Sequence, residues 1–230
     1  MKIIEFIKRE IADWKIYENF GLLFVIALIL HNIIFLHDNF AAVVSSLCGI
    51  LYTILAGKGK IYCYFFGLAG SGCYVALAAI NSVWGNALLY LLYYIPMQIL
   101  GIYKWKKHLK INSAEIVKSK LSNRERIIYL LICILGSILT VFVLSILNDV
   151  SPLIDGITTF LSIVGMYFTI RRLIEQWIIW MIVNGLSFVM WLLLIIDGVR
   201  AFSTLLMWGV YFILAIYFYW VWHKEFDKKS

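Results

Sequence analysis

The chain has 230 residues, of which 63% are hydrophobic and 14% are charged, and its mean hydropathy is +0.90. A soluble protein of this length cannot bury so much apolar surface, so the composition excludes a soluble domain and predicts an all-α integral membrane protein. The net charge of +7 is spread over the segments between apolar runs. Without a separate basic domain, this charge indicates membrane topology and excludes nucleic acid as a partner.

Eight apolar runs divide the chain, each close to or above the length that crosses a hydrocarbon core. They lie at about residues 20–36, 40–56, 61–81, 86–103, 127–147, 152–170, 176–196 and 201–222. Before the first run, residues 2–17 place apolar and charged side chains on opposite helical faces. This pattern predicts an amphipathic helix on the inner membrane surface.

Lysine and arginine alternate strongly between the connectors of these runs. Nineteen of the 20 fall in every second connector or at the two ends of the chain, and Arg200 alone falls on the other side. Basic residues concentrate in cytoplasmic connectors. The pattern therefore predicts a multi-pass protein of a bacterial plasma (inner) membrane with eight spans and both termini in the cytoplasm.

A weak internal repeat relates two triplets of spans. The motif Gly101-Ile-Tyr103 ends the first triplet, Ala215-Ile-Tyr217 ends the second, and a shift of 114 residues superposes the triplets without a gap. One span separates them, so both start on the same side, as in parallel transporter repeats whose substrate site lies between the halves. Four parts are expected. Residues 1–37 form the amphipathic helix and an extra span, and residues 38–107 form the first repeat. Residues 108–150 form the cytoplasmic connector and a linking span, and residues 151–230 form the second repeat and the cytoplasmic tail.

Amides and indoles in two of the predicted spans form the candidate substrate site. Trp177, Trp180 and Asn184 share one helical face at the spacing i, i+3, i+7. In the other triplet Gln98 follows Pro96, which bends its span. The amides of Gln98 and Asn184 lie about 8 and 12 Å from the cytoplasmic ends of their spans at 1.5 Å per residue. Polar side chains at such depth are functional candidates, and bonding between neighbouring helices is the alternative.

Further aromatic residues are candidates for the same site. We expect Tyr94, Trp208 and Tyr211 to line it, with simple helix packing as the alternative. Trp177 begins its span, where an interfacial aromatic belt is equally expected. The other tryptophans near predicted span ends are expected in that belt: Trp14, Trp84, Trp105, Trp220 and Trp222.

The sequence offers little for catalysis or ion coupling. No Asp or Glu occupies the middle of a span, where a proton or sodium relay needs one, so facilitated diffusion is favoured. The four cysteines and four histidines form no ligand spacing, and no phosphate-binding glycine motif is present. We therefore expect no catalytic residues, no metal and no cofactor. Ser122-Asn-Arg-Glu125 predicts a capping box at the start of the fifth span.

Two groups of motifs resemble the PnuC family of vitamin transporters over residues 38–225. The first group is Trp84-Gly85-Asn86, then Tyr93-Tyr94-Ile95-Pro96-Met97-Gln98, then Gly101 and Trp105; the second is Glu175-Gln-Trp177-Ile-Ile-Trp180-Met-Ile-Val-Asn184. The resemblance implies a three-plus-one-plus-three fold similar to a duplicated SWEET-type sugar transporter. One departure is Gly70-Ser71-Gly72, which lies opposite Asn184 in the repeat and makes that side of the site small and open.

The resemblance also implies the substrate and how it is held. It implies uptake of nicotinamide riboside, a precursor for NAD biosynthesis, by a uniporter whose substrate is trapped by phosphorylation in the cytoplasm. Gln98, Trp177, Trp180 and Asn184 would hold it, with aromatic rings stacked on the cationic pyridinium. The alternatives are a thiamine transporter of the same family, a membrane enzyme, and a membrane protein without transport activity. Membrane lipid is the expected surrounding partner, and the oligomeric state stays open, a homo-oligomer included.

Overall fold

The computed structural model describes residues 23, 26–27, 40–80, 89–109, 115–147, 151–196 and 202–227. The amphipathic helix predicted at 2–17 lies outside these residues, as does nearly all of the first predicted span. The helices in the described part are α3 (Phe40–Gly57), α4 (Cys63–Ile80), α6 (Ile95–Lys106), α7 (Asn123–Ile146), α8 (Pro152–Ile170), α9 (Gln176–Ile196) and α10 (Phe202–Asp227). The π-helical turn η1 (Tyr90–Tyr94) leads directly into α6.

These helices confirm the all-helical prediction, and their bounds follow the predicted spans closely. The predicted runs 152–170 and 176–196 coincide with α8 and α9. Three stretches of the described chain are long and apolar enough to cross a membrane: Asn123–Ile146, Pro152–Ile170 and Leu205–Phe226. Shorter apolar stretches lie in α3, α4 and α9.

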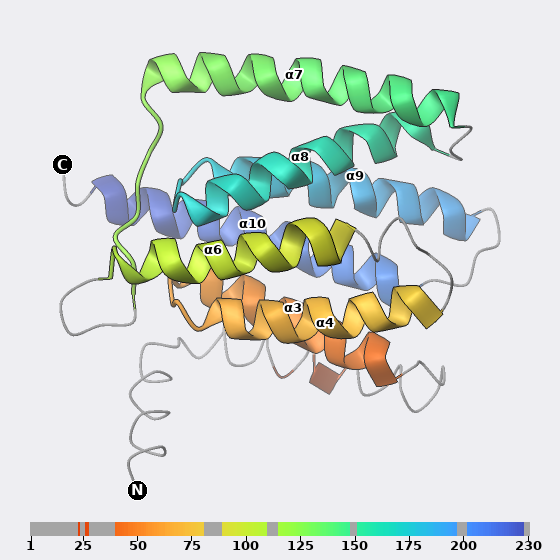
Figure 1. The fold of residues 1–230 in the computed structure, drawn as a ribbon, viewed down its shortest axis with the longest axis horizontal. Helices are drawn as coiled ribbons and strands as arrows, with labels where there is room; N and C mark the ends of the chain where they lie inside the picture. Colours follow the sequence, from red (N-terminus) through yellow and green to blue (C-terminus); the bar gives the residue numbers. More distant parts are fainter. Residues whose placement is uncertain are drawn as a thin grey trace, which may run out of the picture.

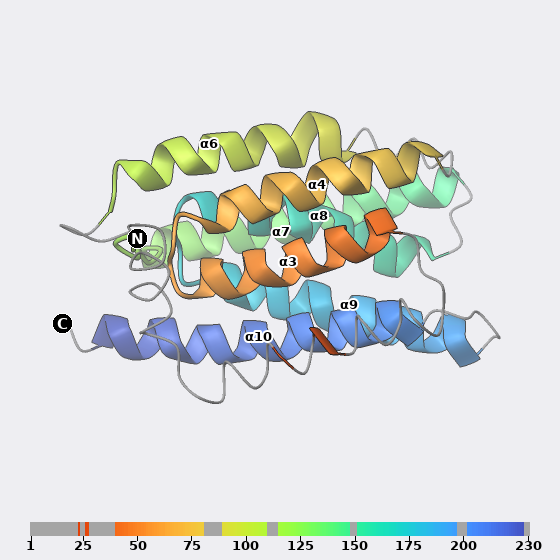
Figure 2. The same cartoon turned by 90° about the horizontal axis from the view of Figure 1, so that it is seen from below.

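The helices form a bundle in which two sets of three interlock. In the first set α3 packs on α4 and α4 on α6; in the second set α8 packs on α9 and α9 on α10. The last helix of each set packs on the first helix of the other, α6 on α8 and α10 on α3 (Figures 1 and 2). The bundle centre is therefore built from both sets.

Helix α7 lies on the outside of the bundle and packs on α8 (Figure 1). Only Cys133 and Ser137 of its 24 residues are buried. Most of its other apolar side chains are exposed, among them Leu135, Leu139 and Phe142 at 62–66%. A helix that is apolar all round and exposed on most of its surface fits a lipid environment.

The turns between the first two helices of each set have the same backbone structure. Each contains one residue with a left-handed backbone, Gly59 (φ 68°) and Arg172 (φ 61°). The following residues, Lys60 and Leu173, donate their N–H groups to carbonyls five positions earlier, at 2.8 and 3.0 Å. The two turns are offset by 113 residues, so the predicted shift of 114 is wrong by one residue here. The helix-ending left-handed position sets this register, and the sequence motifs at 101 and 215 did not reveal it.

An extended segment at residues 115–121, called the strap below, links the two turns at one end of the bundle. We call this the strap end. Ile116 donates its N–H to the carbonyl of Gly59, and Ser119 donates its N–H to the carbonyl of Arg172, both at 2.9 Å. Glu175 accepts the N–H of Leu121. The strap therefore touches the corresponding turn of each set.

The predicted capping box joins the strap to α7 and is confirmed. Ser122 accepts the N–H of Glu125, and the Glu125 carboxylate accepts the N–H of Ser122. Arg126 extends back from α7 to Glu175 at 2.8 Å, so the start of this helix is tied to the second turn.

Two tryptophans expected in the interfacial belt instead belong to the core. Trp105 and Trp222 are both 0% exposed. The Trp105 indole donates to the carbonyl of Thr169 at 3.0 Å, and the Trp222 indole donates to the carbonyl of Gly57. Each bond is accepted by a carbonyl at the end of the first helix of the other set. Nearness to a span end suggested a belt, but the interlocked sets bury these positions.

Candidate functional site

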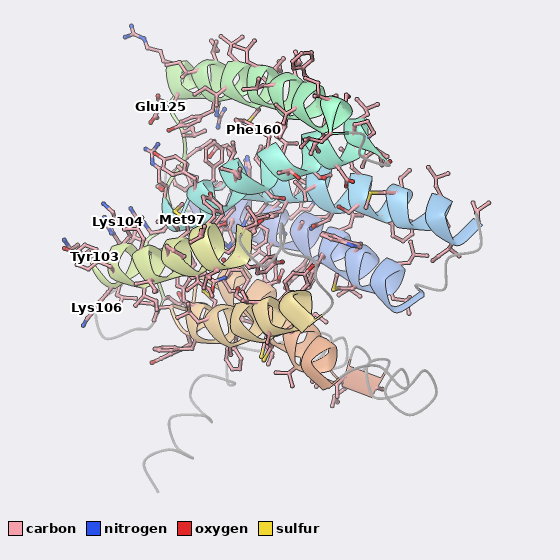
Figure 3. The ribbon with its side chains drawn as sticks, turned by 45° about the vertical axis from the view of Figure 1, so that its right-hand side comes forward. Met97, Tyr103, Lys104, Lys106, Glu125 and Phe160 are labelled. Carbon is pink, nitrogen blue, oxygen red and sulfur yellow. The ribbon has the colours of Figure 1, made fainter. Side chains whose placement is uncertain are left out.

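The Gln98 side chain lies buried on α6 between two residues of α4. Its Nε2 donates to the Ser71 hydroxyl at 2.9 Å. Its Oε1 is buried and has no hydrogen-bond partner within the described part of the chain. A Cβ added to Gly67 would lie 3.0 Å from that oxygen, so the glycine allows the amide to approach α4 closely. Met97, the preceding residue, lies on the side of α6 that faces α8 (Figure 3).

Trp180 is held on α9 by contacts with α8. Its indole N–H donates to the Thr169 hydroxyl at 3.2 Å. Its ring packs on Gly165, where an added Cβ would lie 3.1 Å from the indole carbons. Trp180 remains partly exposed. A fixed indole with part of its surface free can serve as a stacking surface for a flat ligand.

Asn184 is buried one turn further along α9, at 5% exposure. It lies eight residues after the start of its helix at Gln176, and Gln98 lies eight residues before the end of its helix at Lys106. Both are therefore about 12 Å from the strap end at 1.5 Å per residue. Because α6 extends past the predicted span end, the depths match better than the sequence indicated.

Tyr52 and Met166, neither of which was a sequence candidate, join the first helices of the two sets. The Tyr52 hydroxyl lies 3.7 Å from the Met166 sulfur in an O–H···S hydrogen bond. The Tyr52 ring also borders Gly67, so it contacts the same glycine as Gln98. Their sequence separation of 114 residues offered one signal, since residues related by the predicted repeat can meet at its axis.

The π-helical turn η1 directs two tyrosines toward α8. The Tyr93 hydroxyl donates to the carbonyl of Ile163 at 2.7 Å, and the Tyr94 hydroxyl is hydrogen-bonded to the Ser162 side chain. Pro96 follows this turn and has no N–H for the carbonyl four positions earlier, which explains why regular α-helix is interrupted here. The predicted bend at Pro96 thus takes the form of a wider helical turn before it.

Trp208 and Tyr211 lie one turn apart on α10, their rings edge to face at 6.0 Å. The Tyr211 hydroxyl packs against Gly49 of α3. The Trp208 indole N–H is buried and has no partner among the described residues. Tyr211 therefore lies where the second set meets the first, whereas Trp208 packs against a buried cluster that includes residues of α8 and α9.

Trp177 packs away from this group, toward the strap end. It is 2% exposed, with its ring 5.3 Å from Phe218 and 5.7 Å from Trp222, centroid to centroid. Such burial excludes the interfacial belt. Its indole N–H lacks a partner in the described part of the chain, as does the hydroxyl of Tyr64, its equivalent at the offset of 113.

Basic side chains are confined to the ends of the helices. Helices α3, α4, α8 and α9 contain no lysine or arginine, and those of α6 and α10 are in the last turns. Figure 3 shows Lys104, Lys106 and the neighbouring Tyr103 at the end of α6. The residues around Gln98 and Trp180 thus provide neutral hydrogen-bonding groups and aromatic rings. The described residues contain no group of His, Cys, Asp and Glu that could hold a metal ion.

Comparison with known proteins identifies the family. A family profile described as "Nicotinamide mononucleotide transporter" matches residues 39–224. The chain belongs to this family. Members of the nicotinamide mononucleotide transporter family are membrane transporters and not enzymes, so this chain is a multi-pass membrane transporter.

Individual members of the family are similar over most of their length. The chain is 31% identical to the nicotinamide riboside transporter PnuC of Neisseria mucosa, covering 97% of this chain and 87% of the relative. It is 29% identical to the protein of the same name from Haemophilus influenzae, covering 95% of both. A crystal structure of the vitamin B3 transporter PnuC matches with a TM-score of 0.80 and 30% identity over 94% of each chain. The resemblance found in the motifs at Tyr93–Gln98 and Glu175–Asn184 is thereby confirmed.

Proposed function

We propose that this chain carries nicotinamide riboside across a bacterial inner membrane by facilitated diffusion, with both termini in the cytoplasm. In this proposal the chain has eight spans, with two three-helix repeats related at an offset of 113 residues around the turns. The matching turns and the reciprocal packing of α6 on α8 and α10 on α3 support the repeat. The strap end is then the cytoplasmic end.

The observation that carries the substrate assignment is a pair of buried amides at matched depth, one of them a turn away from a fixed indole. Gln98 and Asn184 come from different repeats, and Trp180 lies one turn from Asn184. Such a site suits a flat, cationic, aromatic ring with polar substituents: the rings of Trp180 and of Tyr94, Trp208 and Tyr211 would face the pyridinium, and the amides would bond its carboxamide or ribose. Trp177 would support Trp180 from the side of the strap end.

The distribution of charge favours a nucleoside over a nucleotide. A phosphate carries at least one negative charge, and an unpaired charge buried in the membrane is costly. Lysine and arginine are absent from the mid-helix positions around Gln98 and Asn184. The riboside therefore fits this site better than the mononucleotide in the family's description, and phosphorylation after uptake would trap it inside.

A titration of the purified protein, followed by tryptophan fluorescence, tests the substrate. The ligands are nicotinamide riboside, nicotinamide mononucleotide and thiamine. We expect saturable binding of the riboside, at least tenfold weaker in Asn184→Ala. Tighter binding of thiamine or of the mononucleotide would overturn the substrate assignment.

Uptake into vesicles tests the mechanism. With no acid among the mid-span residues, uptake of labelled riboside is expected to persist when ionophores collapse the proton and sodium gradients. Uptake that stops under these conditions, with no kinase present, would contradict uniport.

A further inference from the structure

The Gln98 carboxamide is engaged at its nitrogen and free at its oxygen. Nε2 donates to the Ser71 hydroxyl at 2.9 Å, and both side chains are 5% exposed. Oε1 is buried without a partner among the described residues. Buried acceptors are nearly always paired in folded proteins, and an exception calls for an explanation such as a ligand.

On one side the neighbour of Oε1 is a glycine, which has no side chain. Gly67 lies one helical turn before Ser71 on α4, and an added Cβ there would be 3.0 Å from Oε1. At the offset of 113 residues set by the turns, Gly67 corresponds to Trp180 and Ser71 corresponds to Asn184. The first set thus places its smallest residue where the second set places an indole. The two sides of the site differ: one presents an aromatic ring, and the other presents an amide oxygen packed on a glycine.

We propose that Ser71 is a positioning residue that fixes the Gln98 carboxamide with its carbonyl oxygen free to accept a hydrogen bond from the substrate. This inference rests on the proposed function. An amide presents two donors at one end and an acceptor at the other, and rotation about its last torsion exchanges them. Holding the nitrogen on Ser71 therefore decides which end meets the substrate. The site selects ligands that carry an N–H or O–H donor, the carboxamide or a ribose hydroxyl of nicotinamide riboside.

The test compares ligand discrimination in Ser71→Ala with that in the wild type. One ligand is nicotinamide riboside. The second is the riboside of 3-acetylpyridine, in which a methyl ketone replaces the carboxamide and removes its N–H donors. The third is the 2′-deoxy analogue of nicotinamide riboside, which lacks one hydroxyl. The wild type is expected to prefer nicotinamide riboside by about tenfold over at least one analogue, because a site built for a donor rejects a ligand without it.

In Ser71→Ala the freed amide can turn either end toward the ligand, so this preference is expected to fall to about twofold. The analogue against which the protein loses its preference identifies the donor group of the substrate. Ser137→Ala is the matched control, since Ser137 is a buried serine on the outer helix α7. It is expected to keep the wild-type ratio. Thermal unfolding of both variants reports whether the protein is folded.

Other outcomes would overturn the proposal. If folded Ser71→Ala keeps the wild-type ratio for both analogues, Ser71 does not position the amide. A second variant, Gln98→Met, retains the length of the side chain and loses both polar ends while Ser71 is intact. If Gln98→Met keeps the ratio, the acceptor lies elsewhere and the proposal is wrong. Failure of the wild type to bind nicotinamide riboside is a different result, because it refutes the proposed function itself.

Discussion

Replacing Gly67 by alanine tests whether the space beside Gln98 is used for binding. The new methyl group would lie 2.8 Å from the Tyr52 ring and 3.0 Å from the Gln98 amide oxygen, while ordinary contacts begin at 3.4 Å. The Tyr52 ring must shift to relieve the shorter contact, and the Gln98 amide must move by a few tenths of an ångström, so the methyl group displaces both side chains. Overpacking by one methyl group costs about 1–3 kcal/mol. Where this cost arises only when the ligand is bound, it weakens binding by about 5- to 150-fold.

Gly72→Ala is the matched control for this prediction. Gly72 is on the same helix, and an added Cβ would meet nothing within 4 Å. Alanine there is expected to leave binding unchanged, since it fills open space and favours the helix. Both variants would be titrated with nicotinamide riboside in detergent and their unfolding temperatures compared. Binding by folded Gly67→Ala within about twofold of the wild type would refute the placement of the substrate over this glycine.

Three further substitutions separate the site from the scaffold. Trp180→Ala is expected to weaken riboside binding by more than about tenfold, because it removes the fixed stacking surface. Trp220→Ala, which replaces an exposed tryptophan of α10, should leave riboside binding unchanged. Equal effects of the two substitutions would argue against stacking. Trp105→Phe removes the indole donor to the Thr169 carbonyl, which still accepts the Arg172 N–H, and replaces a fully buried ring by a smaller one. It should cost about 1–3 kcal/mol of stability, measured by thermal unfolding; an effect no larger than that of Trp220→Phe would contradict a core role. Glu175→Gln weakens the bonds that tie Leu121 of the strap and Arg126 of α7 to the second turn. It should cost about 1–2 kcal/mol after allowance for solvent screening, whereas Arg124→Gln, an exposed charge at the start of α7, should be neutral. High salt should shrink the Glu175 effect, and a salt-independent loss would point to another cause.

Most of the helix bounds could be predicted from the sequence because the membrane imposes them. A span needs a long apolar run, and charged connectors mark its ends. The predicted bounds of α8 and α9 therefore match the structure, and the capping box at Ser122 was recognisable from two residues. The bounds at Pro96 were harder, because the missing N–H predicts a disturbance but does not say that it becomes a π-helical turn.

The candidate site could be predicted less completely. Amides in apolar spans stand out, so Gln98 and Asn184 were found, and the structure places both in buried positions at matched depth. Ser71 was noted only as part of a small side of the site, and Tyr52 was missed, because serine and tyrosine are common in such helices and their partners lie far away in the sequence. The offset error had a direct effect here: at 114 residues Asn184 is opposite Gly70, and at 113 it is opposite Ser71.

The strap also has a consequence for how the two sets can separate. Toward the first turn it makes the Ile116 to Gly59 backbone bond and a 3.7 Å ion pair between Lys60 and Glu115. Toward the second turn Ser119 alone makes three bonds at 2.8–3.0 Å, two through its backbone and one through its hydroxyl. If this end of the bundle opens by parting the two turns, either the Ile116 bond to Gly59 or the Ser119 bonds to the second turn must break, and the strap then moves with one set alone.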